Sequence, residues 1–256
     1  MPILSHFQLQ LPYSTDGGGP LIVSGSELSG CNGYQNSTWF YWNETGSHLV
    51  MNAPPSSTGC AKTSGSKHCR TELREQNPSR WSARGTNTMT VELTVPKADD
   101  GNYGTVIGQV FSAEYSKPVV ELYYKPSGEI YMGVEQTTTG GNTDFNPVGH
   151  VPEGTKFTYE LGYSNDVLSF SLNGGIKQTF DTSQLGYPDS YFKVGDYNQG
   201  TNNYSKSYIR YINNLYTPSM RVLFLQADPF KRMQPTSITY NKAGIIYWRA
   251  WRSLTD

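Results

Sequence analysis

The sequence predicts an all-β protein, a β-jelly-roll sandwich of two antiparallel sheets with an open substrate groove on one face. Strand-like runs recur at short intervals between residues 89 and 197, and helical periodicity is nearly absent. Turn residues separate these runs, as in antiparallel sheets. With 26 Gly, 15 Pro and 19 Tyr, and only 16% charged residues, the composition is typical of a turn-rich soluble protein.

The expected strands follow one another through the middle of the chain, at residues 89–95, 105–111, 119–124, 130–135, 156–163, 167–172, 176–180 and 191–197. Hairpin turns are expected at 125–128, 164–166 and 173–175, where Pro, Asn, Asp or Gly suits the required backbone angles. We expect loops and short edge strands before residue 67. The tail 218–256 is strand-rich, and the sequence leaves open whether it completes the sheets or forms an extra lobe.

Length and charge narrow the classes of function. All-β sandwiches of 256 residues commonly fold as one unit, so we expect a single domain over residues 1–256, and a monomer. The net charge of −1 gives no overall attraction for nucleic acid or anionic lipid, so a polyanion would need a local cluster of cations. The chain has no apolar run of about 20 residues, no phosphate loop and no nucleophile elbow. We therefore expect neither a membrane span nor nucleotide or serine-hydrolase chemistry.

Glycosylation sequons and cysteines favour a secreted, extracellular protein. The sequons begin at Asn36, Asn43 and Asn203. Cys60 and Cys69 can close a short loop, and the sequence favours this disulfide with Cys31 free, without settling the pairing. The first six residues do not resemble a signal peptide, so we expect any signal to have been removed. The cysteines and histidines lack the paired spacing of a zinc site, and no metal is expected.

The most informative stretch runs from residue 67 to residue 75. An extended strand there projects His68, Arg70, Glu72 and Arg74 from one face. Burying such a face in the core costs too much desolvation, so we expect it to meet water or an anionic ligand. Two further stretches behave alike: 106–111 carries a lone amide, Gln109, and 191–199 alternates to give one face with Tyr191, Lys193, Gly195, Tyr197 and Gln199.

Together the three stretches resemble the alginate lyases of polysaccharide lyase family 7. The signatures of that family are R-(S/T)-E-(L/V)-R, Q-(I/V)-H and Y-x-K-x-G-x-Y-x-Q. Residues 70–74 and 191–199 match the first and third in full, and the matches fall in the order of the family. The second signature is broken, because Phe111 stands where the family has its histidine. The resemblance implies a lyase that acts on an acidic polysaccharide without a cofactor.

The resemblance also implies catalytic roles. Removing the C5 proton of a uronic acid builds a dianionic enolate, so the neighbouring carboxylate must be neutralised. Arg70 and Gln109 are the expected neutralisers, although Gln109 alone would be read as a satisfied buried amide. Tyr197 is the expected base and acid, ionised at useful pH by nearby cations such as Arg70 or His68.

The remaining residues of these motifs are expected to bind substrate or to orient other side chains. Lys193 lies about 13 Å from Tyr197 along an extended strand, so it is expected to contact a substrate carboxylate in an adjoining subsite. Glu72 is expected to orient the two arginines, with Arg74 as a subsite cation. Gln199 and Tyr191 are expected to bind sugar hydroxyls, although Tyr191 fits equally well as packing under a loop.

His68 has two readings of equal weight. It either returns an imidazole to the groove, where it neutralises the carboxylate or orients Tyr197, or lies in water at a loop end.

The replacement of the family's histidine by Phe111 indicates which uronic acid the enzyme prefers. In β-D-mannuronate and β-D-glucuronate the C5 hydrogen and the C4 oxygen lie on the same side of the ring, so one tyrosine can serve both in a syn elimination. In α-L-guluronate they lie on opposite sides, where the histidine of the family would help. The sequence therefore favours mannuronan or glucuronan, without choosing between them or between endo and exo action.

Three other functions compete with the lyase. A carbohydrate-binding jelly roll without catalysis is the strongest rival, although a binder has no need of Tyr197, Gln109 and Arg70 together. A glycoside hydrolase needs two facing carboxylates, whereas Glu72 and Glu75 have opposite parity. A structural surface protein is supported by composition alone.

Overall fold

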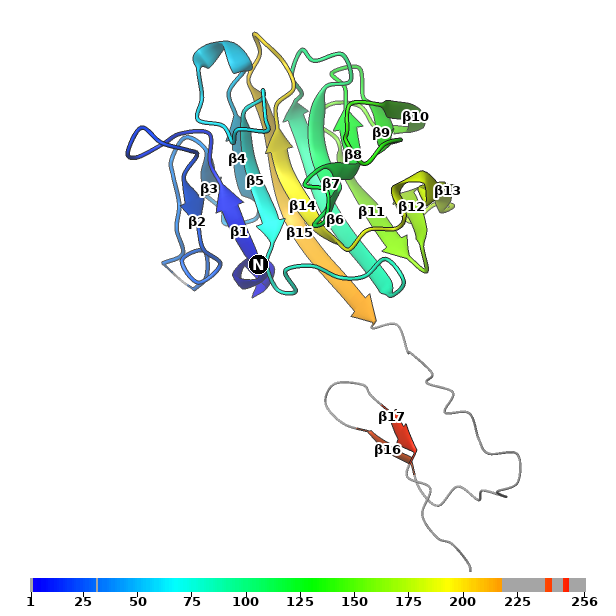
Figure 1. The fold of residues 1–256 in the computed structure, drawn as a ribbon. Coiled ribbons are helices and arrows are strands. Elements are labelled where there is room, and N and C mark those ends of the chain that lie inside the picture. Colours follow the sequence, from blue (N-terminus) through cyan, green and yellow to red (C-terminus); the bar gives the residue numbers. More distant parts are fainter. Residues whose placement is uncertain (1, 31, 218–237, 241–245, 249–256) are drawn as a thin grey trace, which may run out of the picture.

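The fold is a sandwich of two antiparallel sheets, as Figure 1 shows. It is known from a computed structural model that describes residues 2–30, 32–217, 238–240 and 246–248. In the first sheet, sheet A, the strands are ordered β10-β9-β8-β7-β14-β5-β1-β2, and in the second, sheet B, they are ordered β13-β12-β11-β6-β15-β4-β3. The predicted all-β jelly-roll sandwich is confirmed.

The strands of sheet A are β1 (Phe7–Gln10), β2 (Ile22–Val23), β5 (Arg70–Glu75), β7 (Thr105–Ser112), β8 (Pro118–Tyr124), β9 (Glu129–Glu135), β10 (Thr143–His150) and β14 (Ser190–Tyr197). Those of sheet B are β3 (Phe40–Trp42), β4 (Leu49–Ala53), β6 (Thr86–Lys97), β11 (Lys156–Ser164), β12 (Val167–Leu172), β13 (Gln178–Phe180) and β15 (Ser205–Thr217). Two further strands, β16 (Ile238–Tyr240) and β17 (Ile246–Trp248), pair with each other. The other predicted features of the tail lie outside the described residues.

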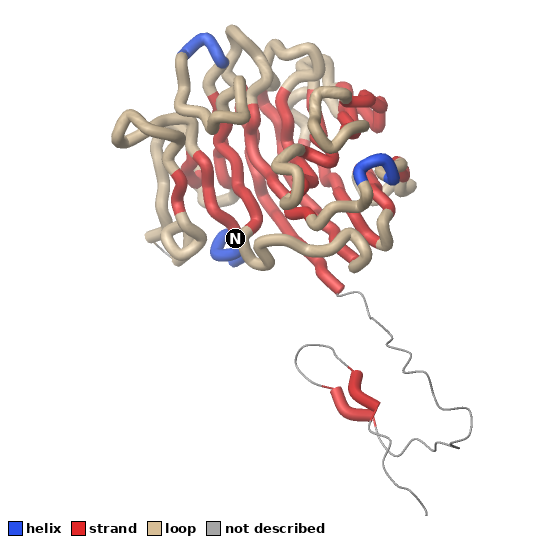
Figure 2. Tube along the Cα trace, viewed as in Figure 1, coloured by secondary structure: helices blue, strands red, loops and turns tan. Residues whose placement is uncertain are grey.

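Helix is confined to three short 3-10 turns in the described part of the chain, drawn in blue in Figure 2: η1 (Pro2–His6), η2 (Ser56–Thr58) and η3 (Ser183–Leu185). None of them is long or apolar enough to cross a membrane.

Every strand predicted between residues 89 and 197 is present, whereas β10 and β15 were not predicted. β10 carries few apolar residues and a proline at 147, which its place at the edge of sheet A tolerates. The alternation in β15 is obscured by Asn213 and Asn214. The predicted turn at 164–166 is confirmed: Asn165 and Asp166 have φ values of 51° and 62°, the left-handed values that a tight hairpin requires.

Alternation along each strand fills the core between the sheets. Leu73 of β5, with Phe192 and Val194 of β14, points inward and is fully buried. Glu75, on the same inward face, accepts hydrogen bonds from Trp81 Nε1 (2.8 Å), the Phe192 backbone N (3.0 Å) and Asn214 Nδ2 (2.7 Å). Asn214 belongs to β15, so Glu75 ties the two sheets together. The residues between these inward positions therefore form the outer face of sheet A.

Gly108 allows β7 to pack closely on sheet B. A Cβ at this position would lie 2.5 Å from the Tyr159 hydroxyl, which donates a 2.8 Å hydrogen bond to the Ile107 carbonyl. This packing fixes the strand just before Gln109.

Gly108→Ala should destabilise the fold by roughly 1–3 kcal/mol, because the added methyl must displace a buried tyrosine. Urea unfolding measures the loss. Gly19→Ala is the matched control, since nothing lies within 4 Å of a Cβ there, and it should change stability by less than about 0.5 kcal/mol. Equal stability of the two variants would contradict this account of the packing.

Candidate active site on the outer face of sheet A

Strand register brings the three predicted motifs together on the outer face of sheet A. β14 pairs with β5 on one side and with β7 on the other. Arg70 lies opposite Tyr197, and Lys193 lies between Arg74 and Gln109. Directly paired residues share a face of a sheet, so these side chains, contributed by three separate strands, converge on one surface.

The centre of this surface is a group that we call the Glu72 cluster: Arg70, Glu72, Gln109 and Lys193. Arg70 Nη1 donates to Glu72 Oε2 at 2.8 Å and Lys193 Nζ donates to the same oxygen at 3.2 Å, while Gln109 Nε2 donates to Oε1. All four residues are buried. The predicted face was one that meets water or an anionic ligand; in the structure its central residues are shielded from water, and their mutual pairing offsets the cost of desolvation.

Glu72 therefore orients a different pair of cations from the one predicted. It holds Arg70, as expected, but its second cation is Lys193 and not Arg74. Burial raises the pKa of Glu72, but Lys193 and Arg70 outweigh it and the pKa is lowered overall. Burial lowers the pKa of Lys193 to about 8, against the opposing effect of Glu72.

Arg74 takes part in a separate stack on the same face. Its guanidinium carbon lies 4.1 Å from the ring centre of Tyr191, and Tyr191 stacks on Phe111 at 5.4 Å. On the other side, Lys193 Nζ lies 4.2 Å from the ring centre of Phe111. Phe111 thus takes part in one cation–π contact, with Lys193, and stacks on the tyrosine of the other, between Arg74 and Tyr191. An imidazole at this position would add polar atoms, whereas the phenyl ring adds none.

Tyr197 lies against Arg70 and the loop before β5. The Arg70 guanidinium carbon is 3.5 Å from the centre of the Tyr197 ring, and the Tyr197 hydroxyl is 3.1 Å from Ser66 Oγ. Ser66 Oγ also accepts from Arg70 Nη2 at 3.1 Å. On its far side Tyr197 joins an aromatic cluster with Tyr103, Tyr123, Tyr131 and Phe145.

The electrostatics of Tyr197 differ from the prediction. Burial raises the pKa of its phenol and outweighs Arg70 and Ser66, which lower it, while Glu121 and Glu72 raise it further. The pKa of Tyr197 therefore lies above that of a free tyrosine, because the nearby positive charge does not offset burial.

His68 lies beside Tyr197 in an edge-on contact, with ring centres 6.2 Å apart. Burial lowers the pKa of His68, and the charges of Arg70, Lys62 and Lys67 lower it further. Both effects favour the neutral form of the imidazole. A neutral His68 can donate or accept a hydrogen bond, but it cannot neutralise a carboxylate as a cation.

Gln199 lies beyond the end of β14. Its side chain is 3.4 Å from the carbonyl oxygen of Tyr197, and its backbone N donates to Asp99 Oδ2 at 2.7 Å. Within the described residues, the Gln199 side chain makes no hydrogen bond to a side chain of the Glu72 cluster.

Several residues on this face were not predicted. Ser66 contacts the Tyr197 hydroxyl, and nothing in the local sequence signals it. Glu121 of β8 lies opposite Gln109 and accepts a 2.5 Å hydrogen bond from Tyr123, and burial raises the pKa of Glu121. As a lone carboxylate in an apolar strand, it carries the same signal that identified Gln109. Gln10 of β1 lies opposite Glu72, and its alternation with Phe7 and Leu9 was visible in the sequence.

The predicted disulfide is present. Cys60 is bonded to Cys69, with their Cα atoms 5.9 Å apart, and Cys69 is fully buried beneath β5. The bond closes the loop that carries Ser66 and so anchors it beside Tyr197. Cys31 lies outside the described residues.

The site carries a net positive charge without a metal cluster. On this face Arg70, Arg74 and Lys193 outnumber Glu72 and Glu121 by one charge, and burial raises the pKa of Glu121. In the described part of the chain, no three His, Cys, Asp or Glu side chains are grouped to hold a metal ion. Such a surface attracts a polyanion.

The amino-acid sequence matches the model of one protein family. The profile described as "Alginate lyase" matches residues 2–226. The chain belongs to the alginate lyase family. It is a polysaccharide lyase. Comparison with curated proteins gave no match.

Solved structures of alginate lyases share the fold. Alginate lyase A1-II′, a member of polysaccharide lyase family 7, has a TM-score of 0.71 and 22% identity, over 84% of this chain and 96% of that one. The enzyme from Klebsiella pneumoniae has a TM-score of 0.69 and 20% identity, over 84% and 96%. PA1167 from Pseudomonas aeruginosa has a TM-score of 0.69 and 23% identity, over 84% and 99%.

Glu72→Gln should destabilise this lyase by roughly 3 kcal/mol, because it leaves Arg70 and Lys193 buried without an anion. Urea unfolding at neutral pH measures the change. Glu160→Gln is the matched control: it breaks the 2.9 Å pair with Lys177 at the surface and should cost under about 1 kcal/mol. If both variants lose the same small amount, the Glu72 cluster does not depend on its carboxylate.

Proposed function

We propose that this lyase cuts a β-1,4-linked D-uronan, either mannuronate-rich alginate or glucuronan, by syn β-elimination. The observation that carries the proposal is the contact of Tyr197 with Arg70 and Ser66, next to the positively charged Glu72 cluster. Crystal structures of alginate lyase A1-II′ variants with a product (GGG) and a substrate (GGMG) support a uronan as the substrate class.

In the proposed reaction Tyr197 handles both protons. Its phenolate oxygen takes the proton from C5, and the C–H electron pair forms the C4–C5 double bond through an enolate. The C4–O bond then breaks, and the new Tyr197 phenol returns its proton to the departing oxygen. The products are a 4,5-unsaturated sugar and a new reducing end.

Neutralisation of the substrate carboxylate is proposed to act through the field of the Glu72 cluster. Gln109 Nε2 and Arg70 Nη1, the groups expected to neutralise the carboxylate directly, both donate to Glu72. Arg70 and Lys193 still exceed Glu72 by one positive charge, in a buried setting where charge acts strongly. Preorganised charge of this kind stabilises an enolate without reorganisation.

Ser66 is proposed to support the phenolate form of Tyr197. A hydroxyl has two lone pairs and one proton. Arg70 Nη2 (3.1 Å) and the His68 backbone N (3.2 Å) donate to Ser66 Oγ, which leaves its proton to share between the His68 carbonyl (3.0 Å) and the Tyr197 oxygen (3.1 Å). Donation to Tyr197 stabilises the ionised phenol. Ser66 therefore passes part of the charge of Arg70 to the reacting oxygen.

The preference for D-uronans rests on Phe111. Its ring is held between Tyr191 and Lys193, so a phenyl group with no proton to exchange stands where the family has an imidazole. An elimination that needs groups on opposite faces of the sugar lacks a partner at this position. A syn elimination with Tyr197 on one face does not require one.

We further propose that the protein is secreted and glycosylated. The disulfide between Cys60 and Cys69 fits an oxidising compartment. Asn203 is exposed, whereas Asn36 and Asn43 are half-buried and their side chains bond to neighbours. Asn203 is therefore the best placed of the three glycan acceptors.

A substrate panel tests the proposed function. We expect mannuronan or glucuronan to be cut at least about tenfold faster than guluronan, read by the ultraviolet absorbance of unsaturated products. Tyr197→Phe should reduce turnover by about 10²- to 10⁴-fold. Guluronan cut as fast as mannuronan would contradict the stereochemical argument, and no unsaturated product from any uronan would contradict the function.

Ser66→Ala should move the rise of kcat/KM to higher pH. Its hydrogen bond lowers the pKa of Tyr197, so its loss raises that pKa, by roughly 0.7 units for about 1 kcal/mol. Because the phenolate is the base, the rate near neutral pH should fall about fivefold and recover in alkali. Ser66→Thr keeps the hydroxyl and should restore the wild-type profile. A uniform loss at every pH would indicate a structural role alone.

A further inference from the structure

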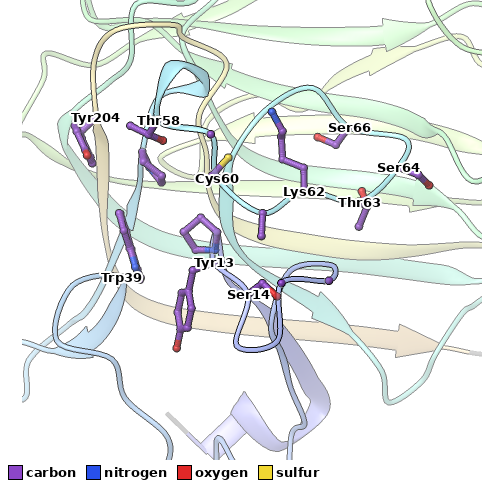
Figure 3. A pocket seen from close by; sticks show the side chains of 16 residues that line it. Tyr13, Ser14, Trp39, Thr58, Cys60, Lys62, Thr63, Ser64, Ser66 and Tyr204 are labelled. Atoms are coloured by element: carbon purple, nitrogen blue, oxygen red, sulfur yellow. The ribbon is translucent and has the colours of Figure 1, made fainter.

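A pocket of about 780 Å³ lies beside the disulfide loop (Figure 3). This is within the usual size range of ligand pockets. Its walls come from the segment after β1 (residues 12–18), from Trp39, from the disulfide loop (residues 58–66) and from Tyr204. None of these residues belongs to the three motifs that identify the family.

One wall of the pocket is aromatic. The rings of Trp39 and Tyr204 are parallel to within 8°, with centres 6.4 Å apart, and Figure 3 places both on the same side. Tyr204 is 47% exposed, which is high for so large a ring. The face of an aromatic ring carries negative charge density, which suits the C–H face of a sugar ring.

The charge at the pocket lining is positive. Among the described residues that line the pocket, Lys62 alone is charged; Asp16 belongs to the 12–18 segment but does not line the pocket, and it accepts hydrogen bonds from Ser14 and Gly18. Lys62 is half-buried, and its Nζ donates to the Lys67 carbonyl at 3.3 Å. Its charge lowers the pKa of His68, so it acts on both the pocket and the candidate active site.

Ser66 joins the pocket to the active site. It lines the pocket, and its hydroxyl is 3.1 Å from that of Tyr197. A polysaccharide whose reacting sugar lies at Tyr197 thus has a neighbouring hollow with an aromatic wall and a cation. Those are the two features that an acidic sugar unit requires, one for its ring and one for its carboxylate.

We propose that this pocket is a binding site for further sugar units of the acidic polysaccharide, away from the bond that is cut. Tyr204 and Trp39 stack on a sugar ring, and Lys62 pairs with its carboxylate. The proposal rests on the proposed function for the identity of the polysaccharide. It predicts that the enzyme binds long chains more tightly than short ones, because only long chains reach the pocket from the reacting sugar.

Binding of oligomers of different length tests the proposal. Isothermal titration calorimetry with mannuronate and glucuronate trimers and octamers is carried out on full-length Tyr197→Phe protein, so that the ligand is not cut. The same background then carries Tyr204→Ala with Lys62→Gln. The matched control carries Tyr211→Ala with Lys97→Gln, an exposed tyrosine and an exposed lysine of sheet B. Melting temperatures verify that all variants fold.

We expect the octamer to bind more tightly than the trimer, and the pocket variant to reduce that ratio about tenfold or more while the control preserves it. An unchanged ratio overturns the proposal, as does an equal loss for both lengths, which would place the effect at the reacting sugar. If the wild type cuts uronans but the ratio is unchanged, the pocket proposal alone fails. If no uronan is cut but the ratio depends on the pocket, the proposed function fails and the binding site stands.

Discussion

The buried carboxylate of Glu72 is the interaction on which this site depends. It holds Arg70 from its own strand, Lys193 from β14 and Gln109 from β7, so one side chain fixes the relative positions of three strands. Two buried cations repel each other and are costly to desolvate, and the anion between them offsets both effects. Because the balance stays positive by one charge, the cluster remains attractive to a substrate anion while the sheet stays intact.

The same burial governs the proton chemistry of Tyr197. Packing among Val106 and Tyr123 removes the phenol from water and raises its pKa, whereas Arg70 over its ring and Ser66 at its oxygen act in the opposite direction. In the proposed reaction, a phenolate in such surroundings is a strong base. A substrate carboxylate that lies against the cluster offsets part of its positive charge, whereas the proposed hydrogen bond from Ser66 to the Tyr197 oxygen stays in place.

Much of the fold followed from sequence, and so did the set of polar residues that meet on sheet A, because side-chain alternation identifies a strand whichever partner it pairs with. The polar faces around Arg70 and Lys193 were visible, and so was the lone Gln109. The sequence did not show which cations Glu72 pairs with. Strand register places Lys193 beside Arg74 and Gln109, and the sequence of one strand alone does not determine its register with another. Ser66 was invisible for a related reason: a loop residue reaches Tyr197 only through a disulfide that sets the path of the loop.

Phe111 packs into the surface without disturbing the Glu72 cluster, and the proposed preference for D-uronans depends on it. Its ring stacks on Tyr191 and makes a cation–π contact with Lys193, and neither contact requires a hydrogen-bonding partner. The Glu72 cluster is unaffected, since none of its hydrogen bonds passes through position 111. The proposed function thus separates charge stabilisation from proton transfer on this sheet: the Glu72 cluster supplies the first, and the proposed syn elimination confines the second to the face of the sugar that Tyr197 reaches.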